Sequence, residues 1–337
     1  MDLVEVPCPV CLGGDTRHVF SVRDYVLRVT DDTFGVRQCR QCGVGFLSPR
    51  PKAADIPRFY PDEFYWTYEK ADEGGVPAGE LLARREVQIE GKLRLIAHLR
   101  PARLLDIGAM KGEFLHVARE RGWRVSGVEF SAEIPNPFDV PMHYGEFTRM
   151  GFPPGSFDCV TMWAVLEHVY EPRAYVREVS RVMADGGTFI GVVTNFNSVQ
   201  ARVLRADDYP RHLTLFTKRS LRRLLMEAGL TPVRMWTDQR LFGGQLRGAL
   251  KYAVKRSLGY TVDEALYEMR NVRDPLEFCS TFKGRKSAAM LWLSRIENIG
   301  LALPERLLDF MGFGMNLGFE ARKLPKAAAG RRRSEGG

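Results

Sequence analysis

The stretch Leu104–Leu115, which reads "LLDIGAMKGEFL", decides the fold of this chain. Its apolar start predicts a buried strand, Gly108 and Gly112 predict a tight turn, and the residues that follow predict the start of a helix. Glycine lets a backbone approach a ligand closely at such a turn, although two glycines there are often turn chemistry alone. Met110 stands where a third glycine would be expected, so its side chain either points away from a ligand or narrows the pocket.

The sequence around this stretch alternates short apolar segments with helical patterns. The expected strands are Ala102–Ala109, Arg124–Phe130, Pro141–Phe147, Ser156–Leu166 and Gly186–Asn195. Helical patterns between them predict βαβ units, and therefore an α/β fold with a parallel sheet covered by helices on both faces. Ligands of such sheets bind at the carboxyl ends of the strands. We therefore expect a binding site where the first strand turns into its helix.

Two Cys-x-x-Cys pairs precede this region, Cys8 with Cys11 and Cys39 with Cys42. Their spacing matches a tetrahedral zinc site with four thiolate ligands, and these residues are the predicted metal ligands. Two disulfides or free thiols are the alternatives, but disulfides need an oxidising compartment. Strand-like alternation between the pairs predicts a small ribbon that zinc, rather than an apolar core, would fold. Removing the metal is then expected to unfold the ribbon alone.

Composition and charge set broad limits on partners and location. The 49 Lys and Arg residues exceed the 41 Asp and Glu residues and give a formal net charge of +8, a modest preference for anionic partners. The sequence contains no apolar run of about 18 residues, the length that would predict a transmembrane segment. Its first residues also lack a signal-peptide pattern. We therefore expect a cytoplasmic protein without a membrane span.

A strand that is followed by Gly108 and Gly112 and then by a helix resembles the first motif of class I S-adenosylmethionine-dependent methyltransferases. The resemblance implies that Asp106 helps to hold the amino-acid end of the cofactor and that the two glycines let the backbone approach it. Glu129 follows 23 residues after Asp106, where this family uses an acidic residue to accept hydrogen bonds from the ribose hydroxyls. NAD-binding domains have an acidic residue at the same offset, so this position alone does not identify the cofactor.

Later segments separate the two families. Residues Gly155–Asn195, which contain "LEH" and end in a glycine pair before a strand, look like the corresponding stretch of these methyltransferases. Residues Arg211–Leu230, "RHLTLFTKRSLRRLLMEAGL", resemble the segment that follows it. The resemblance runs from Leu81 to Val233 and is not expected of a dehydrogenase.

The same resemblance implies further cofactor contacts. Glu146, after the third expected strand, would accept from the adenine amine, with Phe147 beside the adenine ring. A solvated carboxylate at a strand end is the alternative for Glu146. Trp163 ends the fourth expected strand near the place of the cofactor sulfonium, and a plain core position is equally compatible with its sequence.

The paired cysteines together with Cys42–Pro51, "CGVGFLSPRP", resemble bacterial zinc-ribbon methyltransferases of sugar and cell-surface polysaccharide pathways. This resemblance implies a small acceptor that contains a sugar or is linked to a nucleotide, methylated on oxygen or carbon. Zinc ribbons also precede some methyltransferases of ribosomal RNA, so an RNA acceptor is the second hypothesis. A non-catalytic cofactor-binding or scaffold protein is the third.

An oxygen or carbon acceptor has to lose a proton, and histidine is the side chain best suited to take it. His212 is the first candidate base and His168 the second, since both follow strands at the expected carboxyl edge. The alternative is that His212 only holds its loop by a hydrogen bond. An unperturbed imidazole would make the rate fall below about pH 6.5. Ala164 occupies the place of a second acid that related quinone-pathway enzymes use for a metal, which argues against a catalytic metal.

The expected organisation has four parts. Residues 1–70 form the zinc ribbon and an aromatic connecting segment, 71–240 the Rossmann-like methyltransferase core, 241–325 a helical lid or insertion with a final strand, and 326–337 a disordered basic tail. Residues 315–324 would form that final antiparallel strand. The helices of the insertion are amphipathic, and we expect them to pack against the protein as a lid that covers the acceptor. Contact with a membrane surface or a second subunit is the alternative.

Overall fold

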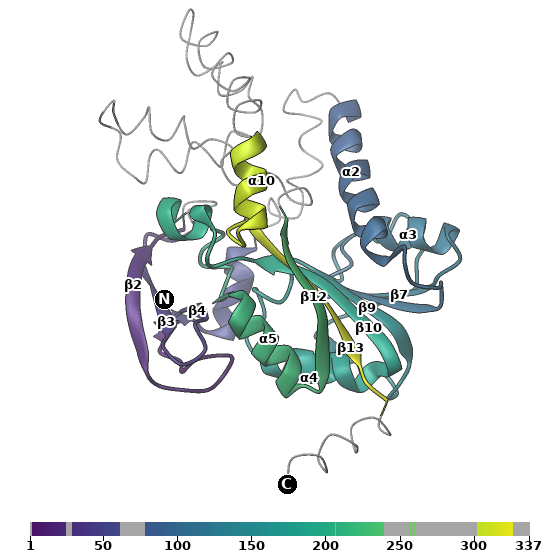
Figure 1. Cartoon of the computed structure of the whole chain (residues 1–337), viewed down its shortest axis with the longest axis horizontal. Coiled ribbons are helices and arrows are strands. Elements are labelled where there is room, and N and C mark those ends of the chain that lie inside the picture. The colour runs from purple at the N-terminus through teal and green to yellow at the C-terminus, as the bar shows by residue number, and fades with distance from the viewer. Residues whose placement is uncertain are drawn as a thin grey trace, which may run out of the picture.

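The computed structural model describes residues 2–24, 29–60, 78–205, 207–238, 257, 259 and 302–325. A seven-stranded sheet forms its centre (Figure 1). In spatial order the strands are β12 (Leu230–Asp238), β13 (Asn316–Lys323), β10 (Met183–Thr194), β9 (Phe157–Trp163), β6 (Arg103–Ile107), β7 (Arg124–Glu129) and β8 (Met142–Tyr144). Neighbours from β10 to β8 pair in parallel, and β13 runs antiparallel between β10 and β12. The predicted α/β fold and the predicted final antiparallel strand are confirmed.

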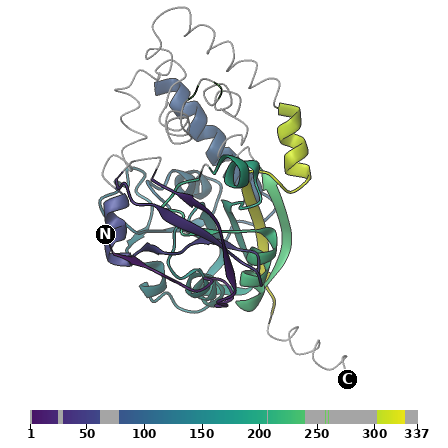
Figure 2. The same cartoon turned by 90° about the vertical axis from the view of Figure 1, so that its left-hand side faces the viewer.

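Helices cover both faces of this sheet (Figures 1 and 2). They are α2 (Ala78–Ile96), α3 (Glu113–Glu120), α4 (Pro172–Val182), α5 (Lys218–Glu227) and α10 (Ala302–Phe310), with short turns η2 (Phe147–Arg149) and η3 (Gln200–Leu204). Successive residues of β6 point to opposite faces. Leu105 packs in one apolar cluster with Val176 of α4, and Leu104 packs in the other with Leu93 of α2. A strand buried on both faces explains the continuous apolar run that predicted it.

The N-terminal segment forms a ribbon beside the sheet. Its elements are β1 (Leu3–Val4), β2 (Thr16–Val22), β3 (Phe34–Cys39), β4 (Gly45–Leu47), β5 (Arg50–Pro51) and η1 (Ala53–Phe59). Strands β2, β3 and β4 form a second sheet whose fourth strand, β11 (Thr214–Leu215), comes from the chain after β10. The ribbon and the central domain therefore share a sheet.

An apolar cluster joins the same two parts. Phe34 and Val36 of β3 are fully buried and belong to one cluster with Phe196, Tyr209 and Leu213. The expectation that the ribbon has no apolar core of its own was therefore wrong, and its dependence on zinc stays a prediction. The alternation of β3 that predicts a strand also gives it an inner apolar face, and the chain around 196–215 covers that face.

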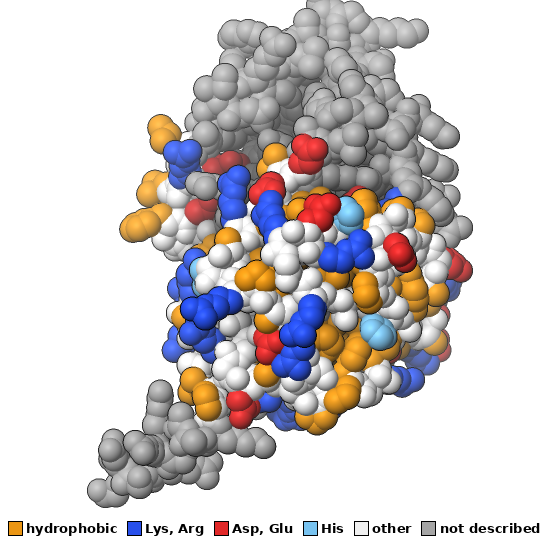
Figure 3. All heavy atoms as spheres, turned by 90° about the vertical axis from the view of Figure 1, so that its right-hand side faces the viewer, with side chains coloured by type: hydrophobic (Ala, Val, Ile, Leu, Met, Phe, Trp, Pro, Cys, Tyr) orange, Lys and Arg blue, Asp and Glu red, His pale blue; other side chains and the backbone are white. Residues whose placement is uncertain are grey.

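Several predicted features lie outside the described residues: the aromatic segment 61–70, most of the insertion, and the basic tail 326–337. Within the described part of the chain, no helix is both long and apolar enough to cross a membrane. On the face shown in Figure 3, basic and acidic side chains lie among apolar ones. The net positive charge therefore does not form one continuous basic surface on that face.

Candidate functional site

The glycine turn after β6 uses left-handed backbone conformations. The φ angle is 76° at Gly108, 50° at Met110 and 83° at Gly112. A Cβ atom at Gly108 would lie 2.4 Å from Cγ2 of Val165, so close packing within the protein already requires glycine there. Met110 adopts a conformation that costs a side chain about 1 kcal/mol or more. Its side chain is 37% exposed and reaches solvent, and its backbone N–H donates a hydrogen bond to Glu129.

Glu129 ends β7 beside this turn and is 6% exposed. Its Oε2 accepts a hydrogen bond from the backbone N–H of Met110 at 2.9 Å, and its Oε1 accepts from the N–H of Phe130 at 2.7 Å. Burial raises the pKa of Glu129, and these backbone N–H groups lower it. Oε1 also accepts from the N–H of Ser131 at 3.4 Å. The backbone thus fixes the orientation of the carboxylate, and Oε2, with one protein donor, keeps a lone pair for a further donor.

Asp106 lies one strand away and is 2% exposed. Its Oδ1 accepts from the hydroxyl of Thr161 at 2.6 Å. Burial raises the pKa of Asp106 to about 7, although the positive charge of Lys92 opposes the shift. Lys92 comes from α2, and its Nζ lies 5.8 Å from the ring centroids of both Phe114 and Trp163. A carboxyl group and an ammonium group therefore face the same side of the sheet edge.

Trp163 ends β9 next to these two charges and is 5% exposed. Its buried indole N–H lies beside the Asp106 carboxyl and lowers the pKa of that group as a donor, although the contact falls short of a well-formed hydrogen bond. Glu146 begins the turn η2 after β8, where its Oε1 accepts from the hydroxyl of Thr148 at 3.3 Å. Phe147 is 1% exposed, and its ring packs against Tyr175 in the core. The structure places all five sequence-derived cofactor side chains, those of Asp106, Glu129, Glu146, Phe147 and Trp163, at carboxyl ends of strands or shortly after them.

The four paired cysteines converge in the ribbon. All four Sγ atoms lie within 4.8 Å of one another, and the shortest separations, 3.5 Å, are Cys8 to Cys42 and Cys11 to Cys39. Four sulfurs around Zn²⁺ at about 2.3 Å stand about 3.8 Å apart, so the cluster matches the size of a tetrahedral site. The sulfurs have the donor chemistry and the spacing that zinc requires.

Arginines of the central domain hold both cysteine turns. Arg173 of α4 donates to the carbonyl oxygen of Val10, and Arg219 of α5 donates to that of Gln41 at 2.8 Å. Arg223 of α5 is paired with Glu227 and also interacts electrostatically with cysteine thiols of the cluster.

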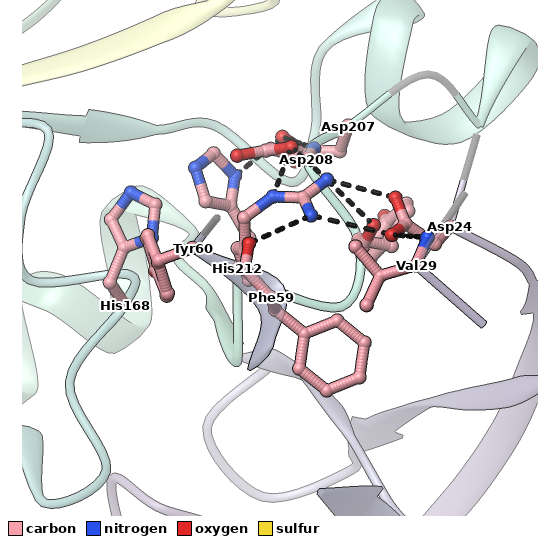
Figure 4. A network of polar contacts seen from close by, with 10 residues as sticks. Asp24, Val29, Phe59, Tyr60, His168, Asp207, Asp208 and His212 are labelled. Atoms are coloured by element: carbon pink, nitrogen blue, oxygen red, sulfur yellow. Dashed lines mark hydrogen bonds and ion pairs between the residues drawn. The ribbon is translucent and has the colours of Figure 1, made fainter. Parts of the chain in front are cut away.

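A second group of polar side chains lies beyond β9 and β10 (Figure 4). The hydroxyl of Tyr60 and Nδ1 of His168 share a hydrogen bond of 2.9 Å. The rings of His168 and His212 meet edge to face with their centroids 4.4 Å apart. Nδ1 of His212 donates to Oδ1 of Asp207 at 2.6 Å. The two candidate bases therefore belong to one buried chain of side chains.

The two histidines have opposite protonation behaviour. Burial, together with the charge of His212, lowers the pKa of His168 to about 3. Burial also disfavours a charged His212, but the charge and hydrogen bond of Asp207, helped by Glu167 and Asp208, raise its pKa to about 9. If His212 is the base, the rate is therefore expected to fall at a higher pH than 6.5, because that value belongs to an imidazole without a carboxylate partner.

Glu167 adds a third titratable group and is fully buried. Its Oε1 accepts from the backbone N–H of Thr194 at 3.1 Å, whereas its Oε2 has no hydrogen-bond partner in the described residues. Burial raises the pKa of Glu167 to about 7. Sequence reasoning missed Asp207, Glu167 and Lys92. The only sequence signal for Asp207 is its acidic neighbourhood, "DDYPRH", five residues before His212.

Residues 81–234 match the model of a family described as methyltransferase domain. Ajmaline N-methyltransferase of Rauvolfia serpentina is 29% identical over 103 residues, 27% of this chain and 35% of that relative. Ubiquinone biosynthesis O-methyltransferase of Sodalis glossinidius is 26% identical over 154 residues, 38% of this chain and 62% of the relative. The chain thus spans less than two thirds of each of these relatives.

A solved structure of 1,6-didemethyltoxoflavin-N1-methyltransferase from Burkholderia thailandensis, with 1,6-didemethyltoxoflavin and S-adenosylhomocysteine bound, is also similar. It is 17% identical, with a TM-score of 0.46, and the likeness covers 87% of this chain and 96% of that one.

Proposed function

We propose that this chain transfers a methyl group from S-adenosylmethionine to a small acceptor. The observation that carries the proposal is the Glu129 carboxylate, oriented by the N–H groups of Met110 and Phe130 beside the glycine turn. A carboxylate held in this way is suited to accept from the two vicinal hydroxyls of a ribose. The match of residues 81–234 to the methyltransferase-domain family supports a sulfonium cofactor rather than a nicotinamide.

The neighbouring groups fit the other parts of this cofactor. Asp106 offers an acceptor to its ammonium group, and Lys92 offers a positive charge to its carboxylate. The buried N–H of Trp163 lies beside the Asp106 carboxyl without a well-formed hydrogen bond, so it can still donate to a polar ligand. We assign Glu146 and Phe147 to the adenine end. The cofactor, when bound, supplies an activated methyl group, so the protein has mainly to align the acceptor.

His212 is the group that we assign to the acceptor proton. Asp207 holds its Nδ1, so Nε2 is the nitrogen that accepts a proton from an O–H or C–H group of the acceptor. The same carboxylate then stabilises the imidazolium that forms. His168, whose pKa burial lowers to about 3, is too weak a base for this step. Its contacts with Tyr60 and His212 fit it to hold the His212 ring in place.

We assign the four ribbon cysteines to one structural Zn²⁺, supported by the mutual distances of their sulfurs. For the acceptor, we propose a molecule that contains a sugar or is linked to a nucleotide. The support for this class is the resemblance of the ribbon and of Cys42–Pro51 to methyltransferases of sugar and polysaccharide pathways. The ribbon lies against the loop of His212, where it would line the acceptor side of the site.

A labelling experiment tests the function and the acceptor class together. The purified protein is incubated with S-adenosylmethionine labelled on its methyl group and with a cell extract separated into RNA, nucleotide-sugar and lipid fractions. We expect label in the nucleotide-sugar fraction. Label in RNA would contradict the acceptor class but keep methyl transfer. No label in any fraction, together with no cofactor binding at millimolar concentration, would contradict the function and favour a scaffold role.

A further inference from the structure

The loop that carries His212 is fastened to the ribbon on its C-terminal side. The backbone N–H of Leu47 donates to the carbonyl of Leu213 at 3.0 Å. The next two residues form β11, in which Thr214 pairs with Phe46 and Leu215 with Gly45 of β4. The residue directly after His212 is thus bonded to a ribbon strand.

On the N-terminal side of His212, Arg211 binds the loop to the ribbon. Its side chain is fully buried, and its Nη2 donates to Oδ1 of Asp24 in the ribbon at 3.0 Å and to Oδ1 of Asp208 at 2.8 Å. Its Nη1 donates to the carbonyl of Phe59 at 3.3 Å. One guanidinium therefore joins the ribbon, the segment that follows it and the loop of His212 (Figure 4).

Asp208 connects this contact to the histidine. The backbone N–H of His212 donates to the carbonyl of Asp208 at 2.8 Å, while the Asp208 carboxylate accepts from Nε and Nη2 of Arg211. The neighbouring residue, Asp207, holds Nδ1 of His212. A shift of the guanidinium would therefore move the turn that supplies both the backbone contact and the carboxylate of His212.

We propose that Arg211 is a positioning residue that, through Asp24 and Asp208, makes the ribbon set the place of the His212–Asp207 pair. The proposal rests on the function proposed above. Its physical basis is the planar fork of the guanidinium, which bonds several acceptors at fixed angles, whereas a lysine ammonium is a point charge on a flexible stem. The ribbon thus contributes to the catalytic site by fixing the position of the loop that carries His212.

The best test keeps the charge and removes the fork. The charged and titratable groups that face His212 are Asp207, Asp208, Glu167, His168 and Arg211. Arg211→Lys leaves all of these charges unchanged, so a change in the protonation of His212 reports its position rather than a lost charge. Nuclear magnetic resonance of ¹³C-labelled histidine in the full chain gives this titration, and the spectrum of His212→Asn identifies the signal.

For Arg211→Lys we expect the pKa of His212 to fall from about 9 toward the ordinary value of about 6.5. The turnover number should fall at least about tenfold, while the affinity for S-adenosylmethionine stays within about twofold, because only the acceptor side is displaced. The titration needs no acceptor, so it decides the positioning role even if the proposed methyl transfer is not found.

Asp24→Asn is the second variant, since it keeps the shape of the partner and removes its charge. Asp15→Asn is its matched control in the same ribbon, because Asp15 pairs with Arg40 on the surface at 3.6 Å, where both side chains are more than half exposed. We expect a lower His212 pKa and lower turnover in Asp24→Asn only. An unchanged His212 titration in both Arg211→Lys and Asp24→Asn would overturn the proposal. Loss of folding in both variants, measured by circular dichroism, would also overturn the proposal. The ion pair of Arg211 and Asp24 would then be needed for the stability of the whole protein rather than for the position of His212.

Discussion

Glu129 is the residue at which cofactor binding is best separated from acceptor chemistry. Glu129→Ala removes charge-assisted hydrogen bonds to the ribose, each worth about 1.5 to 3 kcal/mol, and should weaken the binding of S-adenosylmethionine at least about tenfold in calorimetry. Glu133→Ala is the control, because Glu133 is an exposed acid on the same loop. NAD should bind to neither variant nor to the wild type. Equal cofactor affinity of Glu129→Ala and Glu133→Ala would contradict the ribose role.

His212 is the residue that sets the expected pH dependence. A base acts in its unprotonated form, and Asp207 raises the pKa of His212 to about 9, so the rate should increase with pH up to about 9 and then level off. At pH 7 only about one molecule in a hundred has the base form of such a group. Initial rates between pH 6 and 10 on the labelled acceptor measure this profile.

The variants of this prediction are His212→Asn and, as a control, His143→Asn, which changes an exposed histidine beside Phe152. His212→Asn should lower turnover by about 10² to 10⁴, the usual contribution of a general base, and leave cofactor affinity nearly unchanged. Turnover of His212→Asn within threefold of the wild type would exclude this residue as the base. A loss confined to His168→Asn would move the role there.

At the scale of elements, local patterns predicted six of the seven strands of the sheet, all except β12, together with the glycine turn and α3. These elements are recoverable because each has a periodic apolar face that is visible within about ten residues. The predicted metal site is recoverable for a similar reason, since each cysteine turn is a local pattern. The roles of Asp106, Glu129 and the other cofactor residues stay predictions that the structure accommodates.

The loop from Asp207 to Leu215 could not be predicted in the same way. The two-residue strand β11 has no periodicity of its own, and it exists because β4, which precedes it by more than 150 residues, offers it an edge. Arg211 looks like an ordinary surface arginine in the sequence, but three segments far apart in the chain bury it completely. The raised pKa of His212 depends on this same long-range arrangement.

At the scale of the whole molecule, the shared sheet and the shared apolar cluster change what zinc removal is expected to do. We expect one zinc per chain in metal analysis and loss of that zinc in Cys39→Ser. Chelation should lower the melting temperature of the protein in a single transition, because the ribbon and the central sheet are joined by β11 and by the cluster around Phe34 and Tyr209. Differential scanning calorimetry with and without a chelator measures this.

Two outcomes would contradict this prediction. A chain without stoichiometric zinc would exclude the metal site. Two separate thermal transitions, of which only the first responds to the chelator, would show that the ribbon unfolds alone as the sequence pattern by itself predicted. Cys159→Ser is the matched control, because Cys159 is a buried cysteine of β9 outside the cluster and should leave the zinc content unchanged.

The pairing of β12 with β13 has a consequence for how the chain can change over evolution. Asp238, the last residue of β12, stands opposite Asn316, the first residue of β13. The long excursion between these strands therefore leaves the sheet and returns to it at a single point. Insertions, deletions and exchanges of this segment can accumulate there while the pairing of all seven strands is inherited unchanged.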